Sequence, residues 1–166
     1  MLTAGQIRDL LKLRPLPIEG GYFAETYRSA LRLARGSLSP DSEERSLATA
    51  IYYLLTPETF SSLHRLRSDE IFHFYLGDPV EMLQLHPNGA GDVVLLGQDL
   101  ARGMRPQHVV RAGTWQGSRL CPGGQFALLG TTMAPGFDAG DFEAGDRRQL
   151  AQLYPGHAAF IATLTR

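Results

Sequence analysis

The middle of the chain is a series of short β-type segments separated by turn residues. Thr56–Pro57, Gly77–Pro79 and Pro87–Gly89 supply three of these turns, and the chain as a whole contains 18 glycines and 10 prolines. The predicted strands cover residues 22–29, 47–55, 60–66, 70–76, 80–86, 93–96, 107–111, 116–120 and 126–133. Short strands at this regular spacing, without helical segments between them, predict an antiparallel sandwich or barrel rather than βαβ units.

Helical patterns occur only near the two ends of the chain. Thr3 followed by Gln6 is typical of a capping box, and Pro15 ends the predicted N-terminal helix near Leu13. Residues 146–165 return to helical spacing, with an interruption at residues 155–156, and the polar residues 30–46 are expected to form a mobile surface loop. With 166 residues and no repeats or linkers, we expect a single all-β domain over residues 1–166, with a short N-terminal helix and C-terminal helices.

Composition argues against several functional classes. The formal net charge of −1 provides no general attraction for nucleic acid or anionic lipid. Cys121 is the only cysteine, which excludes an internal disulfide and any multi-cysteine metal site. The longest apolar run is about nine residues, against the 18 or more that a membrane span needs. We therefore expect a cytoplasmic protein that binds neither nucleic acid nor membrane.

The densest polar cluster on the predicted strands contains Ser62, His64, Glu70 and His73. Strand alternation places Ser62 and His64 on one face, and Glu70 on the same face as the neighbouring phenylalanines. His73 falls on the opposite face, but we include it among the candidate ligand-binding residues. An inward glutamate needs a partner, and His64 on the adjacent strand is the expected one. A catalytic pair and a purely structural buried hydrogen bond both fit this pattern.

Aromatic residues outside this cluster are further candidates for ligand contact. Trp115 is expected at the barrel mouth and Phe137 in a lid or a plain turn, and Tyr53 is a further candidate. Arg65 lies opposite to His64 by alternation and is expected at the solvent surface or an interface.

Two spacings resemble the paired motifs of the cupin superfamily. His64-x-Leu66-x3-Glu70-x6-Gly77 resembles the first motif, and Arg111-x-Gly113-x2-Gln116 the second. In that superfamily three histidines and the glutamate hold a divalent metal. Here Leu66 and Gln116 stand where two of the histidines belong, and an amide oxygen is a poor ligand for Fe²⁺ or Zn²⁺. We therefore expect no metal cofactor; any metal would have to use His64, Glu70 and Gln116.

A closer resemblance extends over most of the chain, to one small cupin family of mostly unassigned function. It is carried by residues 19–29 (EGGYFAETYRS), 48–55 (ATAIYYLL), 64–75 (HRLRSDEIFHFY), 115–116, 134–138 (APGFD) and 141–143 (DFE). The resemblance implies a cupin jelly roll, the double-stranded β-helix, usually dimeric and similar to dTDP-4-dehydrorhamnose 3,5-epimerases and seed storage proteins. Strand exchange near residues 22–29 would form the homodimer.

Together these observations predict a barrel that binds a small polar metabolite, such as a carbohydrate or nucleotide derivative. If the protein is an enzyme, metal-independent isomerisation or epimerisation is favoured. His64 would remove a proton next to a carbonyl, Glu70 would orient it, and Tyr53 would return a proton. Ser62, His73, Trp115, Gln116 and Phe137 would contact the ligand. The alternatives are a non-catalytic, storage-like binding protein and a metal-dependent cupin oxygenase or isomerase.

Overall fold

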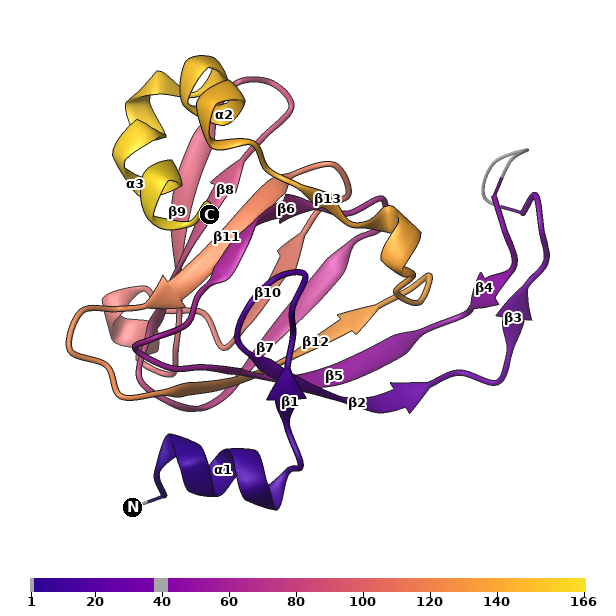
Figure 1. Cartoon of the computed structure of the whole chain (residues 1–166), viewed down its shortest axis with the longest axis horizontal. Helices are drawn as coiled ribbons and strands as arrows, with labels where there is room; N and C mark the ends of the chain where they lie inside the picture. Colours follow the sequence, from indigo (N-terminus) through magenta and orange to yellow (C-terminus); the bar gives the residue numbers. More distant parts are fainter. Residues whose placement is uncertain (1, 38–41) are drawn as a thin grey trace.

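Two antiparallel sheets face each other in the computed structural model, which describes residues 2–37 and 42–166 (Figure 1). The larger sheet has the strand order β1 (Arg14–Pro15), β2 (Tyr22–Arg28), β5 (Thr49–Leu55), β12 (Ala127–Met133), β7 (Glu70–Gly77) and β10 (Gln107–Val110). The smaller sheet has the order β13 (Glu143–Ala144), β6 (Ser61–Arg65), β11 (Trp115–Leu120), β8 (Val80–Leu85) and β9 (Gly91–Leu96). The jelly-roll class is therefore confirmed.

All nine strands expected from the sequence are present, and their ends lie within two residues of the predicted positions. The agreement arises because turn residues interrupt a clear two-residue alternation at each boundary. Four further strands, β1, β13, β3 (Arg32–Leu33) and β4 (Arg45–Ser46), have only two residues each. Segments of that length carry no periodic signal.

One end of the space between the sheets is filled by an apolar core. Phe72 and Phe74 of β7 point into it and pack with Tyr53, Met82 and Leu129. As alternation predicts, His73 and Tyr75 lie on the outer face of the same strand, where their rings stack. The core leaves the other end of the barrel, near the first residue of β7, available for polar side chains.

Short helices cover the outer faces of both sheets (Figure 1). Helix α1 (Ala4–Leu10) begins at the predicted Thr3–Gln6 capping box and packs Ile7 against the larger sheet. Helices α2 (Arg147–Leu153) and α3 (Ala158–Thr163) cover the smaller sheet, and a 3₁₀ turn, η3 (Pro155–His157), separates them. Two other 3₁₀ turns are η1 (Leu100–Arg102) and η2 (Ala139–Asp141). No helix in the described ranges is long and apolar enough to span a membrane.

The expected surface loop at residues 30–46 is partly ordered as a two-stranded ribbon of β3 and β4. This ribbon projects away from the two main sheets (Figure 1). Exposed ion pairs of Arg32 with Glu44 and Arg35 with Glu43 connect its two sides. Residues 38–41 of the expected loop lie outside the described residues. The expected loop therefore contains a short paired ribbon, because cross-strand pairing continues beyond the end of β2.

Candidate functional site

A cavity of about 70 Å³ lies between the sheets at the end of the barrel that the apolar core does not fill. Its polar wall residues are Glu19, Glu25, Thr49, His64, Glu70 and Thr131. Its apolar wall residues are Leu16, Ile18, Phe23, Ile51, Leu66, Met133, Phe137 and Phe142. The cavity therefore combines three carboxylates and an imidazole with three aromatic rings.

Glu19 reaches the cavity because two glycines follow it. Gly20 has φ of +115°, and a Cβ there would lie 2.2 Å from the carbonyl oxygen of Phe60, so only glycine fits this approach. The buried Tyr53 hydroxyl donates a hydrogen bond to the Gly20 carbonyl at 2.9 Å. The Glu19 carboxylate accepts a hydrogen bond from the Ser61 hydroxyl at 2.5 Å. The Ser61 contact holds Oε1 of Glu19, and Oε2 of the same carboxylate lies on the side of His64.

His64 is buried on β6, and its orientation is set by a backbone contact. Its Nδ1 lies 2.7 Å from the carbonyl oxygen of Ser62, so Nδ1–H donates there, and the other ring nitrogen, Nε2, makes no hydrogen bond to a described residue. Nε2 lies 4.0 Å from Oε2 of Glu19, which is too long for a hydrogen bond. The opposite side of the site is closed by Phe142, whose ring stacks on the imidazole with centroids 4.8 Å apart.

Glu70, the first residue of β7, is buried and pairs with an amide rather than with the imidazole. Nε2 of Gln116 donates to Oε2 of Glu70 at 2.6 Å. Burial raises the pKa of Glu70, and the negative charge of Glu19 raises it further. The positive charge of His64 and hydrogen bonds from Thr131 and Gln116 act in the opposite direction. The predicted direct partnership of Glu70 with His64 is thus corrected to partnership with Gln116.

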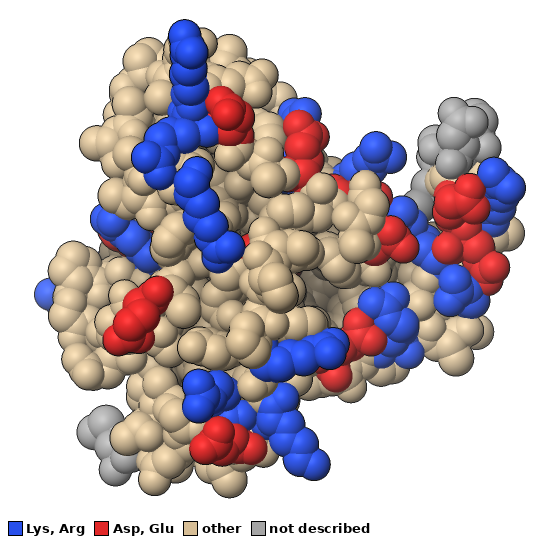
Figure 2. Space-filling view, viewed as in Figure 1, with Lys and Arg blue, Asp and Glu red and all other residues tan. Residues whose placement is uncertain are grey.

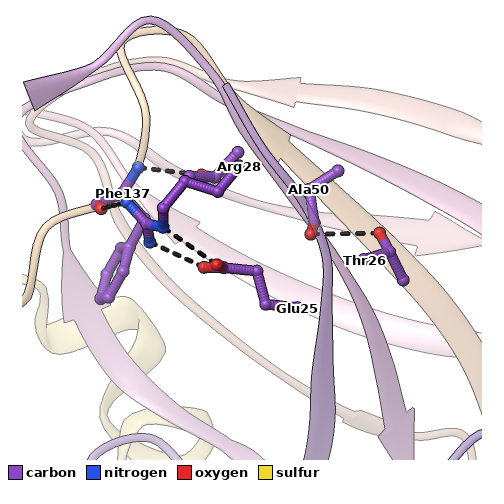
Figure 3. A network of polar contacts seen from close by, with 6 residues as sticks. Glu25, Thr26, Arg28, Ala50 and Phe137 are labelled. Carbon is purple, nitrogen blue, oxygen red and sulfur yellow. Dashed lines mark hydrogen bonds and ion pairs between the residues drawn. The ribbon is translucent and has the colours of Figure 1, made fainter. Parts of the chain in front are cut away.

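Residues 134–142 supply the two remaining aromatic walls, Phe137 and Phe142. The amide of Phe137 donates to the Thr49 hydroxyl at 2.9 Å, and its carbonyl accepts from Arg28 at 3.3 Å. Arg28 also makes two bonds to Glu25, at 2.7 and 2.9 Å, so its guanidinium lies between the two groups (Figure 3). This network joins β2, β5 and residues 134–142 at one side of the cavity.

The structure brings together only part of the predicted residue set. His64, Glu70 and Phe137 line the cavity, and Gln116 lies behind Glu70. The Tyr53 hydroxyl is fully buried and engaged with Gly20, and burial raises its pKa well above the usual value, so it is not placed to return a proton.

Three predicted contact residues lie elsewhere. His73 faces away from the cavity and lies 3.1 Å from the Thr132 hydroxyl. Trp115 packs under the C-terminal helices, with Arg65 over its ring at 4.6 Å. Neighbouring residues on a strand face opposite sides, so Trp115 cannot accompany Gln116 into the barrel. Ser62 does not line the cavity because a bulge in β6 turns Ser61 inward with His64.

Glu19 is the main cavity residue that sequence reasoning missed. It precedes β2 and lies 45 positions before His64, so no strand periodicity connects the two. The Gly20–Gly21 pair was the available signal, because consecutive glycines indicate a close backbone approach.

The side chains at the superfamily's metal-binding positions do not fit a metal. Gln116 presents its amide N–H₂ to Glu70, so a donor already occupies the carboxylate edge that a cation would need. Leu66 presents only carbon to the cavity. Within the described ranges, no group of three or more His, Cys, Asp or Glu side chains is arranged to hold a metal ion.

Comparisons with known proteins identify a matching family model and several similar proteins. Residues 6–145 match the family model Cupin_5, described as cupin superfamily (DUF985). A hypothetical protein from Leishmania major is 34% identical, with a TM-score of 0.88 over 99% of both chains. A protein from Shewanella oneidensis, solved by X-ray crystallography, is 33% identical, with a TM-score of 0.89 over 100% of this chain and 99% of that chain. An uncharacterised protein from Saccharomyces cerevisiae is 31% identical over 157 residues, covering 88% of this chain and 78% of its own length.

Proposed function

The chain belongs to the Cupin_5 family of the cupin superfamily, and from that premise we propose that it binds a small polar metabolite in the His64–Glu70 cavity. The observation that carries the proposal is that His64, Glu19 and Glu70 line one cavity, where Nε2 of His64 makes no hydrogen bond to a described residue. A polar atom that a ligand covers needs a hydrogen-bond partner, so a ligand that supplies a donor there is favoured.

The size of the cavity limits how much of a ligand it encloses. A cavity of about 150 Å³ binds benzene, so 70 Å³ holds roughly three non-hydrogen atoms. A carbohydrate or nucleotide derivative would therefore insert one end between Glu19, His64 and Glu70. The carboxylates disfavour a phosphate at this inner end, so a phosphate group would have to remain outside.

A thermal-shift screen of sugars, sugar derivatives and small organic metabolites tests the binding proposal. A ligand at about 100 times its Kd adds about 2.7 kcal/mol to the free energy of unfolding. Each hit is repeated with Ile51→Phe, which places a larger side chain in the cavity wall, and with Val93→Phe on the exposed side of β9 as the matched control. Hits that survive Ile51→Phe unchanged would contradict binding in this cavity.

Proton transfer is a second candidate function, supported by the different environments of His64 and Glu70. Nε2 of His64 would accept a proton from the carbon next to a carbonyl, and the electron pair would move onto the carbonyl oxygen. Glu70, whose pKa is raised by burial, would donate its proton to that oxygen. For an α-hydroxy carbonyl substrate, Nε2 of His64 would then return its proton to the former carbonyl carbon, and Glu70 would take the proton from the hydroxyl on the deprotonated carbon. These transfers complete an isomerisation without a metal.

Hydrogen exchange of a bound hit tests this second candidate. In D₂O the carbon-bound proton should exchange in the presence of the protein, and His64→Ala should slow that exchange by about 10²-fold or more. Glu70→Gln should also slow it, and the double variant should lose much less than the sum of the two effects. Binding without exchange would favour the non-catalytic, storage-like alternative.

We also propose that the protein forms a homodimer through the β2 end and the β3–β4 ribbon. Tyr27, Leu31 and Leu47 are 55, 69 and 41% exposed there, although all three are large apolar residues. Edge strands and exposed apolar side chains are stabilised by pairing with another chain. Light scattering that shows a monomer at micromolar concentration would contradict this proposal.

A further inference from the structure

We infer that the group this cavity recognises is an ammonium, so that the ligand is a small organic cation such as an amino-bearing, hydroxyl-rich metabolite. The inference rests on the proposed ligand pocket but does not depend on the proposed proton transfer. It follows from the kinds of atoms in the wall, their charge and the aromatic rings beside them.

The polar wall contains several groups that can accept a hydrogen bond from a ligand. Oε2 of Glu19 is not used by Ser61, which bonds Oε1, and Glu70 accepts hydrogen bonds from Gln116 and Thr131. Nε2 of the 1%-exposed His64 makes no hydrogen bond within the described part of the chain. A ligand with several N–H or O–H donors on one atom or on adjacent atoms would satisfy these acceptors together.

The charge of the wall favours a cation over a neutral donor. Glu19 and Glu70 place two carboxyl groups in the wall beside His64. No lysine or arginine lines the cavity among residues 2–37 and 42–166. Arg28, which lies near the cavity, is already paired with Glu25 (Figure 3), and Arg14 lies over the Phe23 ring, 5.0 Å from its centroid. An ammonium would be attracted to these carboxyl groups, and a carboxylate or phosphate would be repelled by them.

Aromatic side chains complete the environment of an organic cation. Phe23, Phe137 and Phe142 line the same cavity. Ring faces carry partial negative charge and attract ammonium groups within about 6 Å of their centroids. On the face of the molecule seen in Figure 2, basic and acidic side chains are intermixed.

Three isosteric or near-isosteric probes separate charge from shape: propylammonium, 1-propanol and propionate. Each is titrated into ¹⁵N-labelled full-length protein at pH 7.5, and the amide shifts of His64, Thr131 and Phe137 are followed. Propylammonium should bind at least tenfold more tightly than 1-propanol, and propionate should bind most weakly. Equal or tighter binding of 1-propanol would overturn the ammonium inference but leave the ligand pocket in place.

Charge variants test whether the cavity carboxylates are responsible. Glu19→Gln keeps the acceptor for Ser61 and should weaken propylammonium binding at least tenfold while changing 1-propanol binding less than twofold. Glu70→Gln provides a second variant if the first does not fold. Glu81→Gln is the matched control, because Glu81 pairs with Arg119 outside the cavity and should have no effect.

Two further outcomes would also overturn the inference. One is the absence of propylammonium shifts at 100 mM, in which case the metabolite screen decides the broader binding proposal separately. The other is tight binding of Zn²⁺ or Mn²⁺ that displaces propylammonium and is lost in His64→Ala.

Discussion

The Gln116→Leu substitution should make the stability of this protein depend more steeply on pH. Where Glu70 is protonated, the variant loses a neutral hydrogen bond worth about 0.5–1.5 kcal/mol. It also loses the buried Oε1 of Gln116, which has no partner among the described residues and costs about 1–3 kcal/mol. These two effects oppose each other, so the variant should be about as stable as the wild type at low pH.

The balance changes once Glu70 ionises. The lost hydrogen bond is then charge-assisted and worth about 1.5–3 kcal/mol. The difference in free energy of unfolding between variant and wild type therefore shifts by about 1–1.5 kcal/mol against the variant, compared with the difference at low pH. Burial makes the pKa of Glu70 higher in the folded state than in the unfolded state, so binding of its proton stabilises the folded state. This stabilisation is complete at a pH below the pKa of the unfolded state, and it is lost as the pH rises through the pKa of the folded state. Removing Gln116 raises that pKa further, which makes the loss larger.

Urea denaturation at intervals from pH 4.5 to 8.5 measures this difference. With a slope near 2 kcal/mol per molar urea, the separation of the two midpoints should grow by about 0.6 M across the range. The same substitution in a Glu70→Gln background should give a separation that does not vary with pH, because the titrating partner is absent. A constant separation in the wild-type background would refute the Gln116–Glu70 interaction described above, as would an unchanged pH dependence in the Glu70→Gln background.

Three other substitutions test separate parts of the structure. Phe142→Ala removes the ring stacked on His64 and should weaken the binding of any cavity ligand about tenfold, as measured by calorimetric titration. Denaturation should show that the free energy of unfolding falls by only about 1–2 kcal/mol. The double change Leu66→His and Gln116→His places imidazole at the two positions where the superfamily motifs have histidine. The Zn²⁺ that survives dialysis should rise toward one equivalent in this variant and stay well under one in the wild type. Equal metal content in both proteins would contradict the conclusion that Leu66 and Gln116 prevent metal binding. Leu31→Lys places a charge on the exposed ribbon and should shift the sedimentation equilibrium from dimer toward monomer, and an unchanged dimer would exclude this ribbon from the interface.

Much of the fold was predictable because it depends on local patterns. Alternation with turn residues identified nine strands, and the same alternation correctly placed Phe72 and Phe74 inside and His73 outside. The Thr3–Gln6 capping box likewise marked the start of α1. Each of these features is encoded within a few consecutive residues.

The site was only partly predictable because its geometry depends on non-local contacts and one irregularity. The bulge in β6 interrupts the two-residue period, so Ser61 rather than Ser62 faces inward with His64. Glu19 comes from the chain before β2, and only tertiary packing brings it beside His64. The bond from Gln116 to Glu70 joins the two sheets, and no spacing in the sequence distinguishes it from a His64–Glu70 bond.

A crystal structure of the protein with a hit from the metabolite screen tests the central claim most directly. We predict electron density for the ligand inside the cavity, with a donor within about 3.2 Å of Nε2 of His64 and contacts to Glu19 or Glu70. A ligand bound elsewhere on the protein, with only ordered water beside His64, would contradict the account.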